Sequence, residues 1–259
     1  LLAAGRSPEA PLRRPPQPQL LPPLLPRARP PLIVPPMETL TVLYDDAHLV
    51  VCVKPAGILS EDDGSPRCMP QLLREHYRAL GQSEEVFAVH RLDREVGGVM
   101  VYSRRPAVTG KLTGLVSQRQ MEKEYLAVLT GHPQSPADTL TDLLFRDAKC
   151  NKSYVVSRMR KGVREASLSY EELGRADALS LVCIRLHTGR THQIRVQFSS
   201  RGLPLLGDRR YGSRDEQCRT ALWSWKLSFR HPVTGKPLTC THLPPDEYPW
   251  NLFQENLPK

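Results

Sequence analysis

Proline is concentrated at the start of the 259-residue chain, where the first 36 residues hold 12 of its 25 prolines. Because proline fixes φ and has no amide N–H, this density excludes regular helix and leaves a sheet short of donors. We therefore expect residues 1–36 to be an extended, polyproline-like disordered leader. Residues 37–259 alternate apolar runs with turn residues, which is typical of a folded domain.

The leader also raises the question of where the native protein starts. It carries five arginines and one glutamate. A transit peptide is likewise rich in Arg and poor in acids, but it is usually rich in Ser and amphipathic, which this segment is not. The chain starts with Leu1, and Met37 directly follows the leader. We therefore favour Met37 as the true start and the leader as a translated upstream region.

Charge and cysteine usage limit the class of protein. The formal net charge is +9, of which the leader contributes +4. This balance permits a polyanionic partner without requiring one. The six cysteines are scattered and form no C-x-x-C pair, which favours a reducing compartment and predicts a cytoplasmic protein. No apolar run reaches about 18 residues, so a membrane-spanning helix is not expected.

Apolar periodicity predicts more strands than helices. Helical spacing covers 69–80, 106–118 and 190–202. Strand-like runs, rich in Val, Leu and Tyr, occur twice within 41–55 around a turn at Asp45-Asp46, and again at 98–104, 123–131, 153–158, 166–173 and 178–186. Because the strands mostly follow one another, we predict an α+β domain with a mixed, mostly antiparallel central sheet flanked by helices.

The stretch HRLDREVGG, residues 90–98, concentrates charge between an apolar run and an expected strand. A loop presented there by a sheet is a common place for functional groups. Arg91 and Arg94 favour the ionised form of Asp93, and a restrained carboxylate suits a nucleophile or a stabiliser of positive charge. On this stretch alone, a surface loop with salt bridges is the simpler interpretation.

A second cluster is LHTGRTHQIRVQF, residues 186–198. Thr191 is expected to cap a helix that displays His192 and Arg195, with Arg190 at its start. An arginine fork binds two oxygens at once, which suits phosphate or carboxylate recognition. An ordinary amphipathic helix with a basic solvent face explains the pattern equally well.

A third candidate is Tyr125, in the expected strand KEYLAVLTG beside Lys123. A tyrosine in such a strand is more often part of the core than a ligand. Its ring nevertheless offers a stacking platform for a nucleic-acid base.

These three segments, in this order, resemble the signatures of the RluA-like pseudouridine synthase family. HRLDREVGG is similar to HRLDxxTSG, and KEYLAVL is similar to the K-x-Y strand. LHTGRTHQIRVQFSSRGLPLLGDRRYG is similar to TGRTHQIRVHLxxxGxPIxGDxxYG, and LVVCVKPAGIL to the opening LVVxNKPAG. The resemblance covers essentially Met37 to the C-terminus, and the agreement of several spaced motifs makes it specific.

The resemblance implies the pseudouridine synthase catalytic fold and an isomerase that needs no cofactor or metal. Such an enzyme breaks the N-glycosidic bond of a uridine in RNA and rejoins the base through C5. Asp93 takes the place of the catalytic aspartate, whether as a nucleophile or as a base. Tyr125 would stack on the target base, Arg195 would hold the Asp93 carboxylate, and Arg91 would fill the gap left by the flipped nucleotide. Arg190 would meet the phosphate backbone.

Two of these motifs depart from the family pattern. VGG replaces TSG after Asp93, and Val53 replaces the Asn before KPAG. Nothing between Met37 and the first motif leaves room for an S4-type RNA-binding module, so the catalytic domain itself is expected to choose the substrate. The family implies ribosomal or transfer RNA as the partner, and a monomer.

Other interpretations remain open at this point. A non-catalytic RNA-binding descendant of the fold is supported by VGG alone. A kinase catalytic loop fails, because Leu92 interrupts HRD and no glycine-rich phosphate loop precedes it. A glycoside hydrolase needs a second carboxylate, for which Glu95 is the nearest candidate. Asp208 is expected to cap or brace a turn rather than to react.

Overall fold

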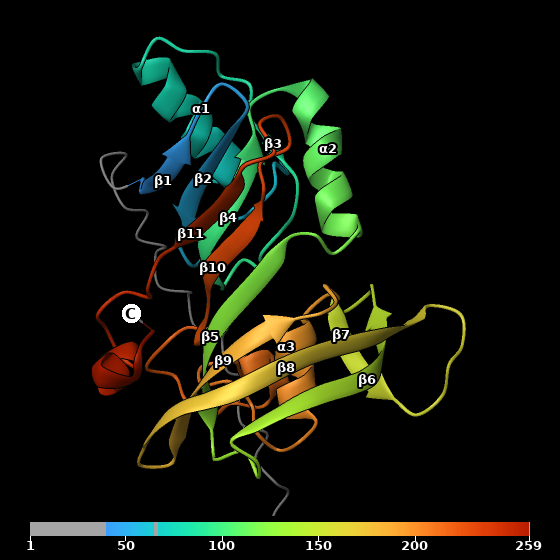
Figure 1. Cartoon of the computed structure of the whole chain (residues 1–259). Coiled ribbons are helices and arrows are strands. Elements are labelled where there is room, and N and C mark those ends of the chain that lie inside the picture. The colour runs from blue at the N-terminus through green and yellow to red at the C-terminus, as the bar shows by residue number, and fades with distance from the viewer. Residues whose placement is uncertain (1–39, 65–66, 259) are drawn as a thin grey trace, which may run out of the picture. The chain divides into compact units, whose positions relative to one another are not determined.

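The computed structural model describes residues 40–64 and 67–258 (Figure 1). The expectations for the leader, residues 1–36, and for Met37 as a start lie outside the described residues.

A single sheet of eleven strands organises the described residues. The strands follow the order β1-β2-β4-β10-β5-β9-β8-β6-β7, with β3 beside β4 and β11 beside β10. Every pair is antiparallel except β4 with β10, so the predicted mixed, mostly antiparallel sheet is confirmed. The strands are β1 (Val42–Asp45), β2 (Leu49–Lys54), β3 (Phe87–Ala88), β4 (Gly97–Ser103), β5 (Glu122–Thr130), β6 (Ala137–Asp147), β7 (Lys152–Val156), β8 (Val163–Ala176), β9 (Leu179–Leu186), β10 (Leu222–Arg230) and β11 (Pro237–Thr241).

The helices are fewer and lie against this sheet. They are α1 (Met69–Ala79), α2 (Pro106–Ser117), α3 (Gln193–Ser199) and the 3₁₀ helices η2 (Arg209–Tyr211) and η3 (Trp250–Asn256). Both α1 and α2 have proline in their first turn, where its missing N–H costs nothing. Of the three predicted helices, 69–80 and 106–118 match α1 and α2 closely at their bounds, whereas α3 is shorter than the predicted 190–202. None of the helices in the described part of the chain is long and apolar enough to cross a membrane.

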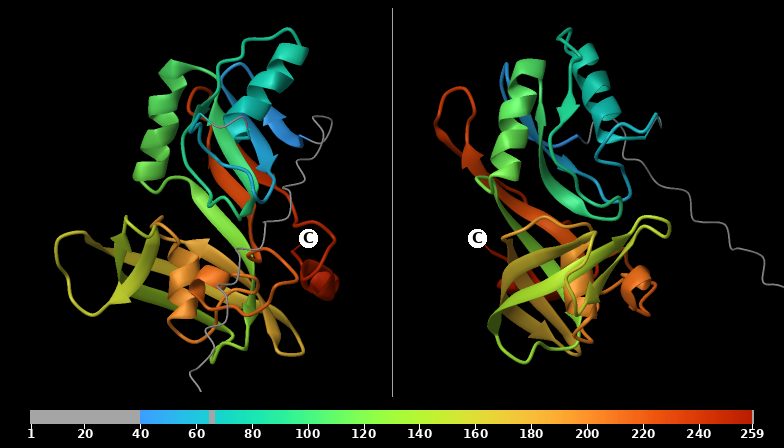
Figure 2. Two further views of the ribbon diagram at one scale, coloured as in Figure 1. Left: turned by 180° about the vertical axis from the view of Figure 1, so that it is seen from behind. Right: turned by 90° about the vertical axis from the view of Figure 1, so that its right-hand side faces the viewer.

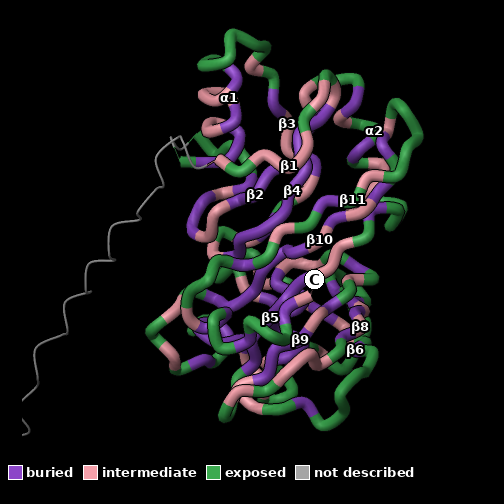
Figure 3. Tube along the Cα trace, turned by 60° about the vertical axis from the view of Figure 1, so that its left-hand side comes forward, coloured by how far each residue is buried: buried purple, intermediate pink, exposed green. Residues whose placement is uncertain are grey.

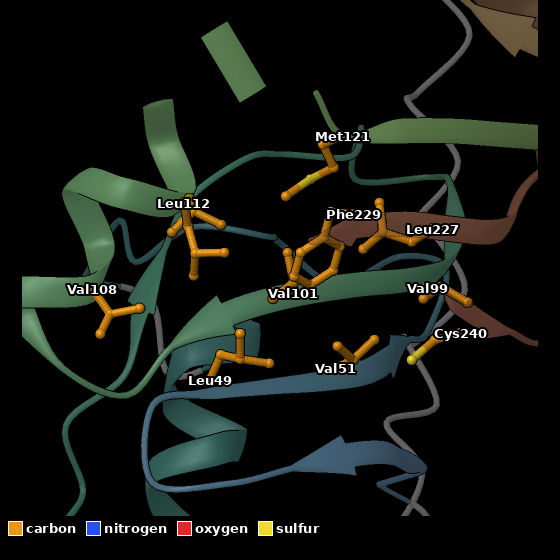
Figure 4. Close-up of a cluster of buried hydrophobic side chains, with 11 residues drawn as sticks. Leu49, Val51, Val99, Val101, Val108, Leu112, Met121, Leu227, Phe229 and Cys240 are labelled. Carbon is orange, nitrogen blue, oxygen red and sulfur yellow. The ribbon is translucent and has the colours of Figure 1, made fainter. Parts of the chain in front are cut away.

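One part of the core lies between α2 and the strands β2, β4 and β10. Val108 and Leu112 of α2 pack against Val51, Val101 and Phe229 of these strands (Figure 4). The opposite side of β2 and β4 is covered by α1 (Figure 2). Every residue of β2 and β4 is therefore buried, and the buried colour continues along both strands (Figure 3). The result is a rigid support for the loop between β3 and β4.

The second part of the core involves α3, which differs from its prediction. All residues from Gln193 to Phe198 are buried, so the alternative of a basic solvent face is wrong. The proposed cap was also wrong, because the N-cap is His192 and no side chain caps the helix. The Thr191 carbonyl instead accepts a hydrogen bond from Ser153 Oγ at 2.7 Å. This contact fastens the start of α3 to β7.

The parallel contact between β4 and β10 depends on two glycines. A Cβ on Gly97 would overlap the ring of Trp223, and a Cβ on Gly98 would overlap the backbone of Ser224. Gly98 also has φ +119°, which side-chain-bearing residues rarely adopt. Ser224 pairs in turn with Tyr125 of β5. The two glycines therefore bring the end of the HRLD loop, the segment 89–96 between β3 and β4, close to the strand that carries Tyr125.

Candidate active site

The HRLD loop, between β3 and β4, is anchored through its buried Leu92. The Leu92 amide donates to Ser60 Oγ at 3.0 Å, and Ser60 Oγ donates to the Leu92 carbonyl at 2.8 Å. His90 Nε2 accepts from the Val101 amide at 3.2 Å. Two residues that precede Asp93 are thus tied to the core, which fixes the path of the loop up to Asp93.

The KPAG segment holds the other side of the same loop. The buried Lys54 ammonium donates to the carbonyls of Ile58, Pro55 and Arg94 at 2.7, 3.0 and 3.2 Å. The Gly57 amide also donates to the Arg94 carbonyl, at 2.6 Å. Burial lowers the pKa of Lys54 to about 7. Three carbonyl acceptors match the three protons of an ammonium group, so Lys54 links the KPAG segment to Arg94, the residue after Asp93.

The Asp93 carboxylate receives its contacts on one oxygen. Arg195 Nη1 donates to Asp93 Oδ2 at 2.8 Å, and His192 Nε2 lies 3.7 Å from the same atom. Among the described residues, Oδ1 has no hydrogen-bond partner. One oxygen is therefore held while the other remains available to a substrate.

Arg195 is itself fixed by Asp208. Nε and Nη2 donate to the two oxygens of Asp208 at 2.6 and 2.8 Å, and both side chains are buried. Burial alone would lower the pKa of Arg195, but the hydrogen bonds and charges of Asp208 and Asp93 raise it. The side chain of Asp208 was expected to cap or brace a turn, and this expectation was wrong. Asp208 is the N-cap residue of η2, but its side chain makes no capping hydrogen bond and binds Arg195 instead.

A cavity of about 240 Å³ opens beside Asp93. All five residues that the sequence singled out line it: Arg91, Asp93, Tyr125, Arg190 and Arg195. Asp93 is the only carboxylate in this lining, which also contains four cationic side chains and two histidines. The volume is somewhat below the range of about 300–1,000 Å³ for drug-sized ligands.

Tyr125 forms a buried wall of this cavity from β5. Burial raises the pKa of Tyr125, and the negative charge of Asp93 raises it further. The phenol is therefore protonated at neutral pH. Its neighbours in the lining include Val116, Leu186, Ile194 and Leu222, so the ring lies in an apolar surface suited to the face of a base.

Arg91 and Arg190 are less constrained than Arg195. The side chain of Arg91 is 60% exposed, and its nearest carboxylate is Glu61 Oε2 at 3.3 Å. Arg190 Nε donates to the Glu165 carbonyl at 2.9 Å, which uses one of its five N–H groups. Both remain able to bind phosphate at the cavity rim.

Three further ionisable residues of the lining were not among the predicted site residues: His90, Lys123 and His192. Burial lowers the pKa of Lys123 to about 8. Burial also holds the pKa of His90 well below its usual value, and the positive charge of Lys123 adds to this effect. All three lie inside the quoted motifs, so the resemblance could have pointed to them. Val116 and Leu222 carry no signal in the sequence.

Glu95 does not supply a second carboxylate. It lies outside the cavity lining, and Arg219 Nη1 donates to its Oε2 at 2.7 Å. A glycoside hydrolase would need two facing carboxyl groups, so this alternative has no support here. No group of three or more metal-ligating side chains occurs in the part of the chain that the structure describes.

Comparison with known proteins agrees with this geometry. A family described as RNA pseudouridylate synthase matches residues 48–200. The dual-specificity RNA pseudouridine synthase RluA of Escherichia coli K12 is 33% identical over 79% of this chain and 94% of its own length. The uncharacterized RNA pseudouridine synthase YhcT of Bacillus subtilis is 30% identical over 79% of this chain and 68% of its own. The chain belongs to the RluA-like RNA pseudouridine synthases, which makes it an isomerase of uridine in RNA.

Solved structures support the fold. Human RNA Pseudouridylate Synthase Domain Containing 1 superposes with a TM-score of 0.68 at 23% identity, covering 83% of this chain and 87% of that one. Human RNA Pseudouridylate Synthase Domain Containing 4 gives 0.66 at 22% identity, covering 79% and 88%. The predicted pseudouridine synthase fold is confirmed.

Proposed function

We propose that this chain modifies a uridine in a folded ribosomal or transfer RNA, with Asp93 as the catalytic residue. The observation that carries the proposal is the state of Asp93 in its cavity. Arg195 holds one oxygen, the other is free of hydrogen bonds from described residues, and Tyr125 lines the same space. An ionised, oriented carboxylate beside a surface suited to a base is what the isomerisation needs.

The reaction breaks the bond between N1 and C1′, turns the uracil, and joins C5 to C1′. The C5 hydrogen leaves as a proton and N1, released from the sugar, takes up a proton, so the nucleoside has the same atoms before and after. Asp93 Oδ1 serves either by attacking the sugar or by removing a ribose proton. Both routes require one carboxylate oxygen to be unoccupied, and the Arg195 contact on Oδ2 leaves Oδ1 available.

The target nucleotide must leave its stack to reach Asp93, at a cost of a few kcal/mol. Arg91 is placed to offset this cost, because it is exposed at the cavity rim only two residues before Asp93. Its planar guanidinium can stack and hydrogen-bond in the vacated position. Arg190 and Lys123 add positive charge for the phosphates of the flipped nucleotide.

The domain organisation belongs to the same proposal. Residues 37–259 act as one catalytic domain, as a monomer in the cytoplasm. One relative is named as a dual-specificity RNA pseudouridine synthase, so ribosomal and transfer RNA are both arms of the test.

The test uses ribosomal and transfer RNA transcribed with uridine tritiated at C5. Formation of the C5 bond expels the label, so tritium in water counts turnovers. Wild type should release it from one RNA class, and Asp93→Asn should release none while still folding. Glu95→Gln is the matched control, because it neutralises an exposed carboxylate of the same loop outside the cavity and should stay active. Activity of Asp93→Asn near wild type would reject the assignment.

A further inference from the structure

His192 has a backbone conformation that demands an explanation. Its φ is +54°, in the left-handed region, at the residue directly before α3. Left-handed backbone is uncommon outside glycine, although histidine adopts it more readily than most side chains. The imidazole is buried and reaches back to the Asp93 carboxylate, with Nε2 3.7 Å from Oδ2. Such strain is found where a functional group must point in one direction.

Tyr211 determines which imidazole nitrogen carries the proton. The Ser153 amide, which can only donate, approaches Tyr211 Oη at 2.8 Å, and Oη lies 2.9 Å from His192 Nδ1. The phenol oxygen accepts from Ser153, which leaves its O–H to donate to His192 Nδ1, and we assign the pair in this direction. A neutral imidazole that accepts at Nδ1 carries its hydrogen on Nε2. That N–H is on the side of the ring nearest Asp93.

We infer that His192 is a positioning residue, held by Tyr211 as the Nε2–H tautomer so that it becomes the second donor to Asp93 Oδ2. This inference rests on the proposed function and extends it. At 3.7 Å the contact is slightly longer than a hydrogen bond, and such contacts often shorten when substrate binds. With Arg195 and His192 both on Oδ2, the carboxylate cannot rotate, and Oδ1 stays directed to the nucleotide.

The charges around His192 are balanced, so burial decides its state. Burial lowers the pKa of His192, and it is the largest influence. The groups that face the imidazole are Asp93 and Asp208, which favour the charged form, and Arg195 and Arg210, which oppose it. The Lys152 ammonium also lies 5.3 Å from the centre of the Tyr211 ring. A neutral imidazole at neutral pH is therefore the consistent assignment.

A single turn supports both donors to Asp93. Asp208 binds Arg195, and Tyr211, three residues later, binds His192. The Arg195 guanidinium also lies 5.1 Å from the centre of the Tyr211 ring. Tyr211 is fixed in turn by Ser199 Oγ, which donates to its carbonyl at 2.5 Å. The GDRRYG segment thus has a role in orienting the carboxylate.

Kinetic tests separate this role from a purely structural one. His192→Asn tolerates left-handed backbone but lacks an N–H at the Nε2 position, whereas His192→Gln can supply one. We expect His192→Asn to lower kcat by on the order of ten- to a hundredfold with little change in KM, as for loss of one hydrogen bond to a charged group. The acid limb of its pH profile should move to higher pH, because the ionised carboxylate has lost a donor. His192→Gln should recover part of the rate.

Tyr211→Phe and Tyr170→Phe form a matched pair of variants, because each removes one phenol hydroxyl. Tyr211→Phe removes the hydroxyl that fixes the tautomer of His192, and should move the acid limb in the same direction as His192→Asn but less far. The Tyr170 hydroxyl donates to the Ser135 carbonyl, and Tyr170 does not line the cavity, so the acid limb of Tyr170→Phe should coincide with that of wild type. An unmoved acid limb in His192→Asn overturns the inference, even if its kcat falls.

A spectroscopic measurement tests the assigned tautomer of His192 without turnover. The chain has eight histidines, and the ¹⁵N spectrum of histidine-labelled protein distinguishes the two neutral tautomers. The His192 signals are assigned by their loss in His192→Asn. We expect Nε2–H in wild type and a mixture in Tyr211→Phe, and an Nδ1–H tautomer in wild type overturns the inference. If no RNA is turned over, the proposed function fails, while the spectrum still decides the tautomer.

Discussion

Two carboxylates share the Arg195 guanidinium, and we predict that only one of them is needed for stability. Asp208 is buried, with a side chain 1% exposed, and makes two hydrogen bonds to Arg195. Asp93 makes one, and its side chain is 21% exposed. Asp208→Asn should therefore destabilise the fold, whereas Asp93→Asn should leave it nearly unchanged.

The magnitude follows from what each substitution leaves behind. Removing one partner of a buried ion pair costs about 3–5 kcal/mol, because the other charge stays buried. Asp93 still compensates part of the Arg195 charge, so we expect about 3 kcal/mol for Asp208→Asn. In a domain of this size that lowers Tm by roughly 6–12 °C. After Asp93→Asn, Arg195 keeps its buried partner, and the loss should stay below about 1 kcal/mol.

Urea denaturation followed by tryptophan fluorescence measures both values. The three tryptophans, Trp223, Trp225 and Trp250, are all buried, so their emission should report global unfolding. The m-value should be the same for wild type and both variants, since the area exposed on unfolding does not change. Equal loss of stability in the two variants, or a loss below about 1 kcal/mol for Asp208→Asn, would refute the division of roles.

Three other substitutions test parts of the support around Asp93. Gly97→Ser should cost about 1–3 kcal/mol by overpacking against the Trp223 ring, and Gly97→Ser with Trp223→Leu should recover most of it in the same denaturation assay. Burial lowers the pKa of Lys54 from 10.5 to about 7, so between these pH values the unfolded chain binds more protons than the folded one and the free energy of unfolding rises with pH. In Lys54→Met, the denaturation midpoint should rise less between pH 7 and pH 10 than in wild type. Arg91→Ala, at an exposed position, should change stability by less than about 0.5 kcal/mol, yet it should slow tritium release from paired RNA more than from an unpaired oligonucleotide of the same sequence.

Each of these three predictions has an outcome that would contradict it. If Trp223→Leu fails to rescue Gly97→Ser, the missing Cβ at Gly97 has another cause than the ring. An unchanged pH slope in Lys54→Met would place the titrating group elsewhere. Equal slowing on paired and unpaired RNA would mean that Arg91 contributes binding but does not replace the flipped nucleotide.

Local patterns in the sequence were sufficient for much of the fold. Helical spacing gave α1 and α2, and strand-like runs gave β2, β4, β5 and β9, because these elements depend on side chains close together in the chain. The strands β6, β10 and β11 were not predicted. The central position of β10 arises from pairing with β4 and β5, whose residues lie about a hundred positions away. No local pattern encodes that pairing.

The candidate site divides in the same way. Motifs gave Arg91, Asp93, Tyr125, Arg190 and Arg195, and the structure brings all five to one cavity. The resemblance also gave the contact of Arg195 with Asp93. The contacts of Ser60, Lys54 and Tyr211 were not predicted, because each joins segments that are distant in sequence. Asp208 was expected to serve a local turn, and its grip on Arg195 is visible only when α3 and η2 are placed side by side. The VGG departure likewise became intelligible only with Trp223 in view.

The pairing of Gly97 and Gly98 with Trp223 and Ser224 has a consequence for the order of events during synthesis. A ribosome delivers the HRLD loop more than a hundred residues before the strand that β4 must lie against. At about 5–20 residues per second, that interval lasts several seconds. During it Asp93 lacks Arg195, Asp208 and the Tyr125 wall in their final places. The nascent chain therefore passes the exit tunnel, surrounded by ribosomal RNA, without an assembled catalytic centre.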